Sequence, residues 1–189
     1  MTILYPTETL YALGVNALDR ESLKTLFALK ERDERKPASW LVRTIDDIAA
    51  YAEVPPIAMR IAKAFLPGSL TLILRAKLNI SDAVVAKDRT IGFRISSDPI
   101  AQRLIGEFME EHGAPLTCTS ANVSGAPTLP TVGEILQQFG SRARLIETVI
   151  DDGPRKGLAS TIVRVIDDSI EILREGDITP EAIYAATIG

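Results

Sequence analysis

The sequence predicts a single-domain α/β fold whose sheet is mixed, with helices flanking it. The chain has 189 residues, a length at which one domain with a sizeable core is expected. Hydrophobic residues make up 46% of the chain and charged residues 24%, which are ordinary values for a globular protein. Strand-like and helix-like segments alternate, and three strand-like segments follow one another near the C-terminus. The alternation favours an α/β fold, and the consecutive strands favour antiparallel pairs within its sheet.

The first half of the chain carries recognisable start signals for its helices. Asp19 is a typical N-cap residue, and Thr44 followed three residues later by Asp47 resembles a capping box. We expect helices over residues 20–31, from Thr44 through Tyr51 and from Pro55-Pro56 to about Phe65. Strands are expected at Thr2–Tyr5, Ser39–Val42, Leu70–Leu74 and Thr90–Ile95, with a polar helical stretch between the last two.

The second half begins with a helix that Pro99 starts, because proline is favoured in the first turn. Between Gly113 and Gly133 there is no charged residue, while Ser, Thr, Pro and Gly are abundant, which indicates a turn-rich stretch. Further helices are expected over Thr131–Phe139 and from Pro180. Strands are expected at Pro115–Thr119, Leu145–Ile150, Ser160–Val165 and Glu171–Leu173.

Composition excludes several kinds of chemistry. Cys118 is the single cysteine and His112 the single histidine, so the chain can form neither an internal disulfide nor a Cys/His zinc site. We expect Cys118 to be a core residue and His112 to cap a helix end. A net charge of −4 argues against extended contact with nucleic acid. Without a long apolar run or a basic leader, a soluble cytoplasmic protein is expected.

Three polar segments could carry chemistry, and each also has a simpler structural interpretation. Residues 6–14 place threonine hydroxyls and a carboxylate after the first strand, where open α/β sheets bind ligands, but they could form only a capped turn. Residues 30–36 are rich in Lys and Arg and could bridge phosphates, or form a salt-bridged helix end. Residues 119–125 offer hydroxyls, an amide and backbone N–H groups to an anion, or form a Ser/Thr turn.

Arg94 lies in an apolar strand, where an unpaired charge would be costly. Its partner is either an internal Asp or Glu or the carboxylate of a ligand. Arg174 and the Ser160-Thr161 pair raise the same question.

Taken together, these segments form an ordered set of motifs that resembles the YrdC family, the threonylcarbamoyl-AMP synthases. The resemblance spans about residues 3 to 178. The motifs are Pro-Thr-Glu-Thr-x-Tyr-x-Leu-Gly (6–14), Lys-x-Arg (30–32) before Lys36-Pro37, Pro-Gly-x-x-Thr (67–71), the strand around Arg94, Thr-Ser-Ala-Asn-x-Ser-Gly (119–125), Gly…Ser-Thr (157–161) and Leu-Arg-x-Gly (173–176). The resemblance implies a twisted mixed sheet with an electropositive concave cavity.

The resemblance also implies a reaction. L-Threonine, bicarbonate or CO2, and ATP, with Mg²⁺ on its phosphates, give threonylcarbamoyl-AMP and pyrophosphate. A separate transferase complex then modifies tRNA with the threonylcarbamoyl group. By motif, the implied ATP contacts are Lys30, Arg32, Lys36, Thr90, Ser120, Asn122 and Arg174. Four of these are also the implied catalytic residues, namely Lys30, Arg32, Ser120 and Asn122. The implied threonine contacts are Thr7, Thr9, Arg94 and Ser160. Neither step demands a protein nucleophile or an imidazole. Positioning of the substrates and stabilisation of the phosphate charge by the contacts named above would suffice.

Two features of the sequence keep alternatives open. Five residues precede Pro6, so the N-terminal helix usual in the family is expected to be missing. Residues 90–102 resemble the YciO branch of the family, whose role is less settled. The alternatives are a YciO-like paralogue, a non-catalytic RNA-binding or ribosome-associated protein, and a carbamoyl-transfer module like that of HypF proteins. Retention of both Lys-x-Arg and Ser-x-Asn favours the synthase.

Overall fold

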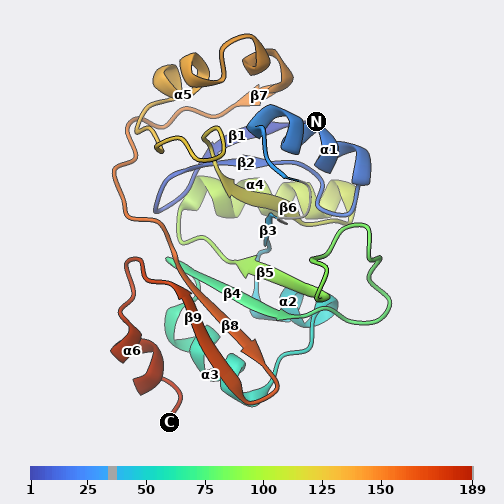
Figure 1. Ribbon diagram of the computed structural model, residues 1–189, viewed down its shortest axis with the longest axis vertical. Coiled ribbons are helices and arrows are strands. Elements are labelled where there is room, and N and C mark those ends of the chain that lie inside the picture. The colour runs from blue at the N-terminus through green and yellow to red at the C-terminus, as the bar shows by residue number, and fades with distance from the viewer. Residues whose placement is uncertain (34–37, 189) are drawn as a thin grey trace.

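Nine strands of the described residues form one mixed sheet, with helices packed on its two faces (Figure 1). The computed structural model describes residues 1–33 and 38–188. The strands are β1 (Ile3–Pro6), β2 (Tyr11–Gly14), β3 (Ser39–Leu41), β4 (Leu70–Arg75), β5 (Thr90–Arg94), β6 (Leu116–Ser120), β7 (Thr148–Val149), β8 (Thr161–Ile166) and β9 (Ser169–Arg174). The helices are α1 (Arg20–Lys30), α2 (Ile45–Tyr51), α3 (Pro56–Phe65), α4 (Pro99–His112), α5 (Val132–Phe139) and α6 (Pro180–Ala185), with a 3-10 helix over Gly140–Leu145.

The strand order is β7-β1-β2-β6-β3-β5-β4-β8-β9. The pairs β1·β7, β3·β5 and β4·β8 are parallel, and the remaining neighbours are antiparallel. This confirms the predicted mixed α/β sheet.

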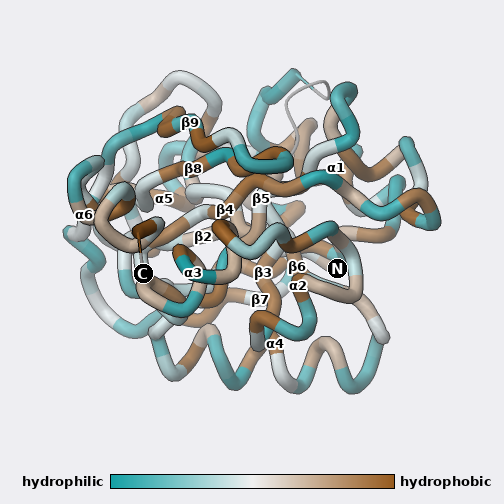
Figure 2. Tube along the Cα trace, turned by 90° about the horizontal axis from the view of Figure 1, so that it is seen from below, coloured by the Kyte–Doolittle hydropathy of each residue, from teal (hydrophilic) through white to brown (hydrophobic). Residues whose placement is uncertain are grey.

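Side chains of β1 alternate between two hydrophobic layers, as the two-residue period of a strand requires. Ile3 and Tyr5 pack with residues of α4, whereas Leu4 packs in a larger cluster with residues of α1, α3 and α5. In Figure 2, α4 lies along the lower edge of the molecule, apart from most of the other helices. The sheet therefore has a buried face on each side.

The predicted helix starts are confirmed by their caps. Asp19 accepts hydrogen bonds from two N–H groups of the first turn of α1, and Thr44 and Asp47 form a reciprocal capping box on α2. Asp98 caps α4 in the same way as Asp19 caps α1. Within residues 1–33 and 38–188, no helix combines the length and apolar character needed to cross a bilayer.

Three stretches differ from the predicted elements. Residues 11–14 form the strand β2, where the sequence predicts no separate strand, because four residues after a threonine-rich turn give little signal. Residues 76–89, all of them described, form turns and no helix, since the Arg89 side chain satisfies the carbonyls of Lys77 and Ile80 locally. The predicted strand Leu145–Ile150 is reduced to β7, because a 3-10 helix takes up its start.

Candidate active site

Two adjoining cavities bring together most of the predicted site residues. The first has a volume of about 210 Å³, and its walls include Thr7, Thr9, Arg94, Ser160 and Arg174. The second has a volume of about 410 Å³ and is lined by the end of α1 and the loop after β6. Arg32 and Ser120 line both cavities, so the two are neighbours.

Sheet register explains how distant segments meet at the first cavity. Thr71 on β4 pairs with Ile162 on β8, and Ile162 pairs with Arg174 on β9. Arg94 ends β5 one residue after Phe93, which pairs with Leu72 on β4. Residues about a hundred positions apart in the sequence therefore lie close together on neighbouring strands of one sheet.

Arg94 has an internal anionic partner, which answers the question that the sequence left open. The guanidinium forms an ion pair with Glu8, and Nη1 donates to Thr9 Oγ1 at 3.2 Å. The second oxygen of Glu8 accepts a hydrogen bond from the Ser96 hydroxyl. Burial alone would lower the pKa of Arg94, but the neighbouring Cys118 and Glu8 groups raise it overall. The arginine is therefore a charged, fixed part of the cavity wall.

Arg174 and Ser160 form a second fixed unit of this wall. The Nε and Nη2 groups of Arg174 donate to the Ser160 carbonyl at 3.0 and 2.8 Å. The Ser160 hydroxyl lies 2.8 Å from Thr71 Oγ1 in a buried contact. Burial and the nearby charge of Arg94 lower the pKa of Arg174. Two guanidinium groups thus lie close enough to repel each other, and an anion between them would relieve that repulsion.

The threonines of the first segment shape the cavity mainly through a turn. Thr7 Oγ1 donates to the Leu10 carbonyl at 2.6 Å and accepts from the N–H groups of Thr9 and Leu10. Thr9 Oγ1 lies 3.0 Å from Thr7 Oγ1 and accepts from Arg94. The sequence left open whether residues 6–14 form a capped turn or face a ligand. The loop is a capped turn, and its threonines also line the first cavity.

Lys30 is buried, with an exposed fraction of 1%, and serves the fold of the second cavity. Its ammonium donates to the Ser120 carbonyl and, at 2.8 Å, to the Asn122 carbonyl. Burial and the charge of Arg32 lower the pKa of Lys30 to about 7. Two of the three ammonium donors are therefore used within the chain, although Lys30 also lines the second cavity, and the expected phosphate contact stays a prediction. Contact with a phosphate would use the third donor.

Asn122 and Ser120 hold the loop after β6 in shape. Ser120 Oγ donates to Asn122 Oδ1 at 2.6 Å, and Asn122 Nδ2 donates to the carbonyls of Val123 and Ala126. The Ser124 N–H donates to the Lys30 carbonyl at 2.8 Å, which docks the loop on the end of α1. The Ser/Thr-turn interpretation of this segment is therefore correct, and the loop still lines both cavities.

Arg32 follows α1 because the helix ends in a left-handed residue. Glu31 has φ of 51°, and the Arg32 N–H donates to the Phe27 carbonyl at 2.9 Å, as in a Schellman motif. Partial burial lowers the pKa of Arg32. The charged residues that line the first cavity, within the described part of the chain, are Arg32, Arg94 and Arg174. Such a lining suits an anionic ligand.

One predicted site residue among those described, Thr90, lines neither cavity. Thr90 starts β5 and its hydroxyl donates to Asp88 at 2.7 Å, so its role stays a prediction. Lys36 lies outside the described residues. Conversely, Glu8 and Thr71 were not named as site residues, although a hydroxyl in the aliphatic run Leu70–Leu74 is a signal that could have identified Thr71.

Cys118 lies beside Arg94, with Sγ 4.0 Å from Nη1. Burial raises its pKa, so the thiol is a poor nucleophile, as expected for a core residue. Among the described side chains, His, Cys, Asp and Glu do not gather in threes where they could hold a metal ion.

Known proteins share this architecture. A relative from Methanocaldococcus jannaschii, assigned provisionally as a threonylcarbamoyl-AMP synthase, is 40% identical over 175 residues, which cover 92% of this chain and 79% of that protein. The threonylcarbamoyl-AMP synthase of Bacillus subtilis is 34% identical over 189 residues, covering 97% of this chain and 52% of that protein. The chain thus spans about half the length of the Bacillus relative.

Two solved structures have the same fold. The crystal structure of P. abyssi Sua5 complexed with L-threonine matches with a TM-score of 0.86 at 30% identity, covering 98% of this chain and 53% of that one. The crystal structure of E. coli YciO matches with a TM-score of 0.82 at 26% identity, covering 96% of this chain and 86% of that one. Residues 1–176 match the model of the Sua5/yciO/yrdC family, described as "Telomere recombination". The chain therefore belongs to the Sua5/YciO/YrdC family.

Proposed function

We propose that this chain is a nucleotidyltransferase that forms threonylcarbamoyl-AMP from L-threonine, bicarbonate or CO2, and ATP, with release of pyrophosphate. The observation that carries the proposal is the pair of adjoining cavities that meet at Arg32 and Ser120. One cavity offers an arginine-lined space to a small anionic molecule, and the other adds a loop of backbone amides next to a cationic helix end. The names of the relatives and the threonine complex of P. abyssi Sua5 support this assignment.

Threonine binds in the first cavity in this proposal. Its carboxylate faces the positive charge of Arg94, and the hydroxyls of Thr9 and Ser160 lie on the same wall. Arg174, an expected ATP contact, lines this first cavity and not the second, so we assign its charge to the threonine site. Glu8 neutralises part of that charge, so the two guanidinium groups together retain a surplus that one carboxylate can match.

ATP binds along the second cavity. Arg32 faces the phosphates, the loop after β6 offers Ser120 and its backbone, and Lys30 holds that loop in shape. Lys36 completes the proposed contacts, whereas Thr90 lines neither cavity and is left out of the proposed site. Mg²⁺ enters with the phosphates of ATP, as it commonly does in nucleotide sites.

The proposed chemistry has two steps. The threonine amine attacks CO2, which forms a C–N bond and releases a proton, and the product is a carbamate. A carbamate oxygen then attacks the α-phosphorus of ATP, and the bond from that phosphorus to pyrophosphate breaks. Arg32 lies where the two cavities meet, so its charge can stabilise the phosphate oxygens during the second step. Both steps rely on positioning and charge, which matches the residues present.

The product is an activated adenylate, and we propose that a separate transferase passes its threonylcarbamoyl group to tRNA in the cytoplasm. The transferase, and not this chain, would catalyse that step.

The first test is pyrophosphate release from ATP, measured with and without threonine and with and without bicarbonate. Release that requires both, together with the adenylate detected by mass spectrometry, is the expected result. A folded protein that binds ATP but releases no pyrophosphate under these conditions would contradict the proposal.

Two variants separate the two cavities. Arg32→Ala is expected to raise the KM for ATP about tenfold or more, because a charge-assisted phosphate contact is lost. Arg94→Lys keeps a charge opposite Glu8 but loses the guanidinium geometry, so the KM for threonine should rise more than that for ATP. Equal effects of both variants on both substrates would contradict the assignment.

A further inference from the structure

The segment that joins β7 to β8 crosses most of the sheet without regular structure. β7 is the first and β8 the eighth strand in the sheet order, and residues 150–160 make the connection. In a flat sheet, seven strand spacings would be about 34 Å, whereas eleven extended residues reach at most about 40 Å. Figure 1 shows this connection as a long orange trace along one side of the molecule. Eleven residues are thus enough to make the connection, and each anchor along the segment fixes part of its path.

The anchored part of the segment passes over the turn that forms the first cavity. The Gly157 N–H donates to the Thr9 carbonyl at 3.1 Å. A Cβ atom at Gly157 would lie 2.6 Å from that carbonyl oxygen, so the contact leaves no room for a side chain. Ala159 and Ser160, just beyond, line the first cavity together with Thr7 and Thr9. The end of the segment is thus part of the wall of that cavity.

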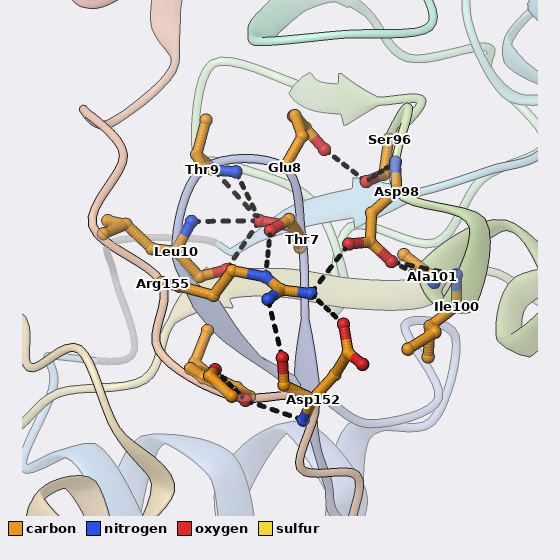
Figure 3. Close-up of polar contacts among 12 residues, drawn as sticks. Thr7, Glu8, Thr9, Leu10, Ser96, Asp98, Ile100, Ala101, Asp152 and Arg155 are labelled. Atoms are coloured by element: carbon orange, nitrogen blue, oxygen red, sulfur yellow. Dashed lines mark hydrogen bonds and ion pairs between the residues drawn. The ribbon is translucent and has the colours of Figure 1, made fainter.

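Two side chains hold this segment in place. The Tyr11 hydroxyl donates to the Gly153 carbonyl at 2.8 Å, and Arg155 makes the contacts drawn in Figure 3. Nε donates to the Thr7 carbonyl at 3.1 Å, and Nη1 donates to the Asp152 carbonyl at 2.9 Å. Nη2 binds the carboxylates of Asp98 at 3.1 Å and Asp152 at 2.6 Å. The guanidinium also lies 6.0 Å from the centre of the Tyr11 ring. One planar group therefore joins the segment to the Thr7 turn and to the start of α4.

A chain of polar contacts connects Arg155 to Arg94. The Asp98 N–H donates to Ser96 Oγ at 3.2 Å, and the Ser96 hydroxyl donates to Glu8. Glu8 in turn pairs with Arg94. Figure 3 shows Glu8, Ser96, Asp98 and Arg155 following one another in this order. A shift of Asp98 would therefore reach the carboxylate that fixes Arg94.

We propose that Arg155 is a positioning residue that holds residues 151–160 as the closed wall of the first cavity and so sets the affinity for the amino-acid substrate. This proposal rests on the proposed function only for the identity of that substrate. Without Arg155, the buried carboxylate of Asp98 loses its cationic partner, and the segment keeps fewer contacts with the Thr7 turn. The wall then opens more often, while the second cavity keeps its own contacts.

The experiment compares the full-length wild type with Arg155→Ala, Arg155→Lys and the control Arg103→Ala, an exposed arginine on α4. Hydrogen exchange of residues 7–10 and 151–160 is measured alongside the affinities for threonine and ATP. Arg155→Ala should speed exchange in both stretches and weaken threonine binding roughly tenfold, the size expected when one charged contact is lost. ATP binding should change less than about twofold. Arg155→Lys should fall between, because lysine keeps the charge but not the planar fork.

Gly157→Ala tests the same wall without altering a charge. It should weaken threonine binding and speed exchange as Arg155→Ala does, since the added Cβ pushes the segment from the Thr9 carbonyl.

Unchanged exchange in Arg155→Ala would overturn the proposal, and so would an equal loss of threonine and ATP binding with exchange raised over the whole chain. If the wild type binds no threonine, the proposed function fails. In that case the positioning role of Arg155 is tested by the hydrogen exchange of residues 7–10 and 151–160 alone.

Discussion

The ion pair between Glu8 and Arg94 gives a sharp test of how the first cavity is held together. The two side chains have exposed fractions of 14% and 8%, so water compensates only in part for a lost partner. Glu8→Gln keeps the size and one acceptor oxygen but removes the charge that matches Arg94. Breaking a buried pair in this way costs about 3–5 kcal/mol, and the retained acceptor places the expected loss near the lower end.

A loss of about 3 kcal/mol is a large part of the roughly 5–15 kcal/mol that stabilises a typical domain. At this chain length, the melting temperature should fall by roughly 6–12 °C. Urea unfolding followed by circular dichroism measures the free energy directly. The matched control is Glu21→Gln, which removes an exposed pair with Lys24 and should cost less than about 0.5 kcal/mol.

The double variant Glu8→Gln/Arg94→Met checks the physical cause. It removes the unpaired buried charge, so it should be more stable than Glu8→Gln alone. A Glu8→Gln protein within 0.5 kcal/mol of the wild type, or a double variant less stable than the single one, would refute this reasoning.

Three further predictions concern buried groups. The pKa of Lys30 is about 7 in the folded chain and near its ordinary 10.5 when unfolded, so the unfolded state binds more protons between these values. Stability should therefore rise by about 2 kcal/mol from pH 7 to pH 9, and urea unfolding of Lys30→Met should lack this rise. Cys118 should resist alkylation by iodoacetamide in the native protein and react in urea; native reactivity would contradict its burial. Asn122→Ala should lose about 1–2 kcal/mol in urea unfolding and weaken ATP binding, because two carbonyls lose their donor; unchanged ATP affinity would separate this loop from the nucleotide.

Local signals in the sequence were sufficient for most elements of the fold. The N-cap at Asp19, the capping box at Thr44 and the proline at Pro99 mark helices that the structure confirms. These signals depend only on residues within four positions in the sequence, so they can be recognised before the fold is known. The strand β2 had no such signal, since four residues that are buried on both sides show no alternation.

The ordered motifs also identified the family, and most of the residues they singled out line two adjoining cavities. Which partner each polar group takes could not be predicted in the same way. Glu8 pairs with Arg94 across 86 positions, and Lys30 reaches carbonyls about 90 positions away. Sheet order and helix packing bring these partners together. Rules that use only neighbouring residues in the sequence cannot predict such pairs.

Sequence patterns therefore predicted most of the elements and identified the family. The roles of Lys30, Glu8 and Arg155 emerged from tertiary contacts, because each role depends on the group that pairs with the charge or accepts its hydrogen bonds. Such a partner belongs to another segment, and the folded sheet brings the two together.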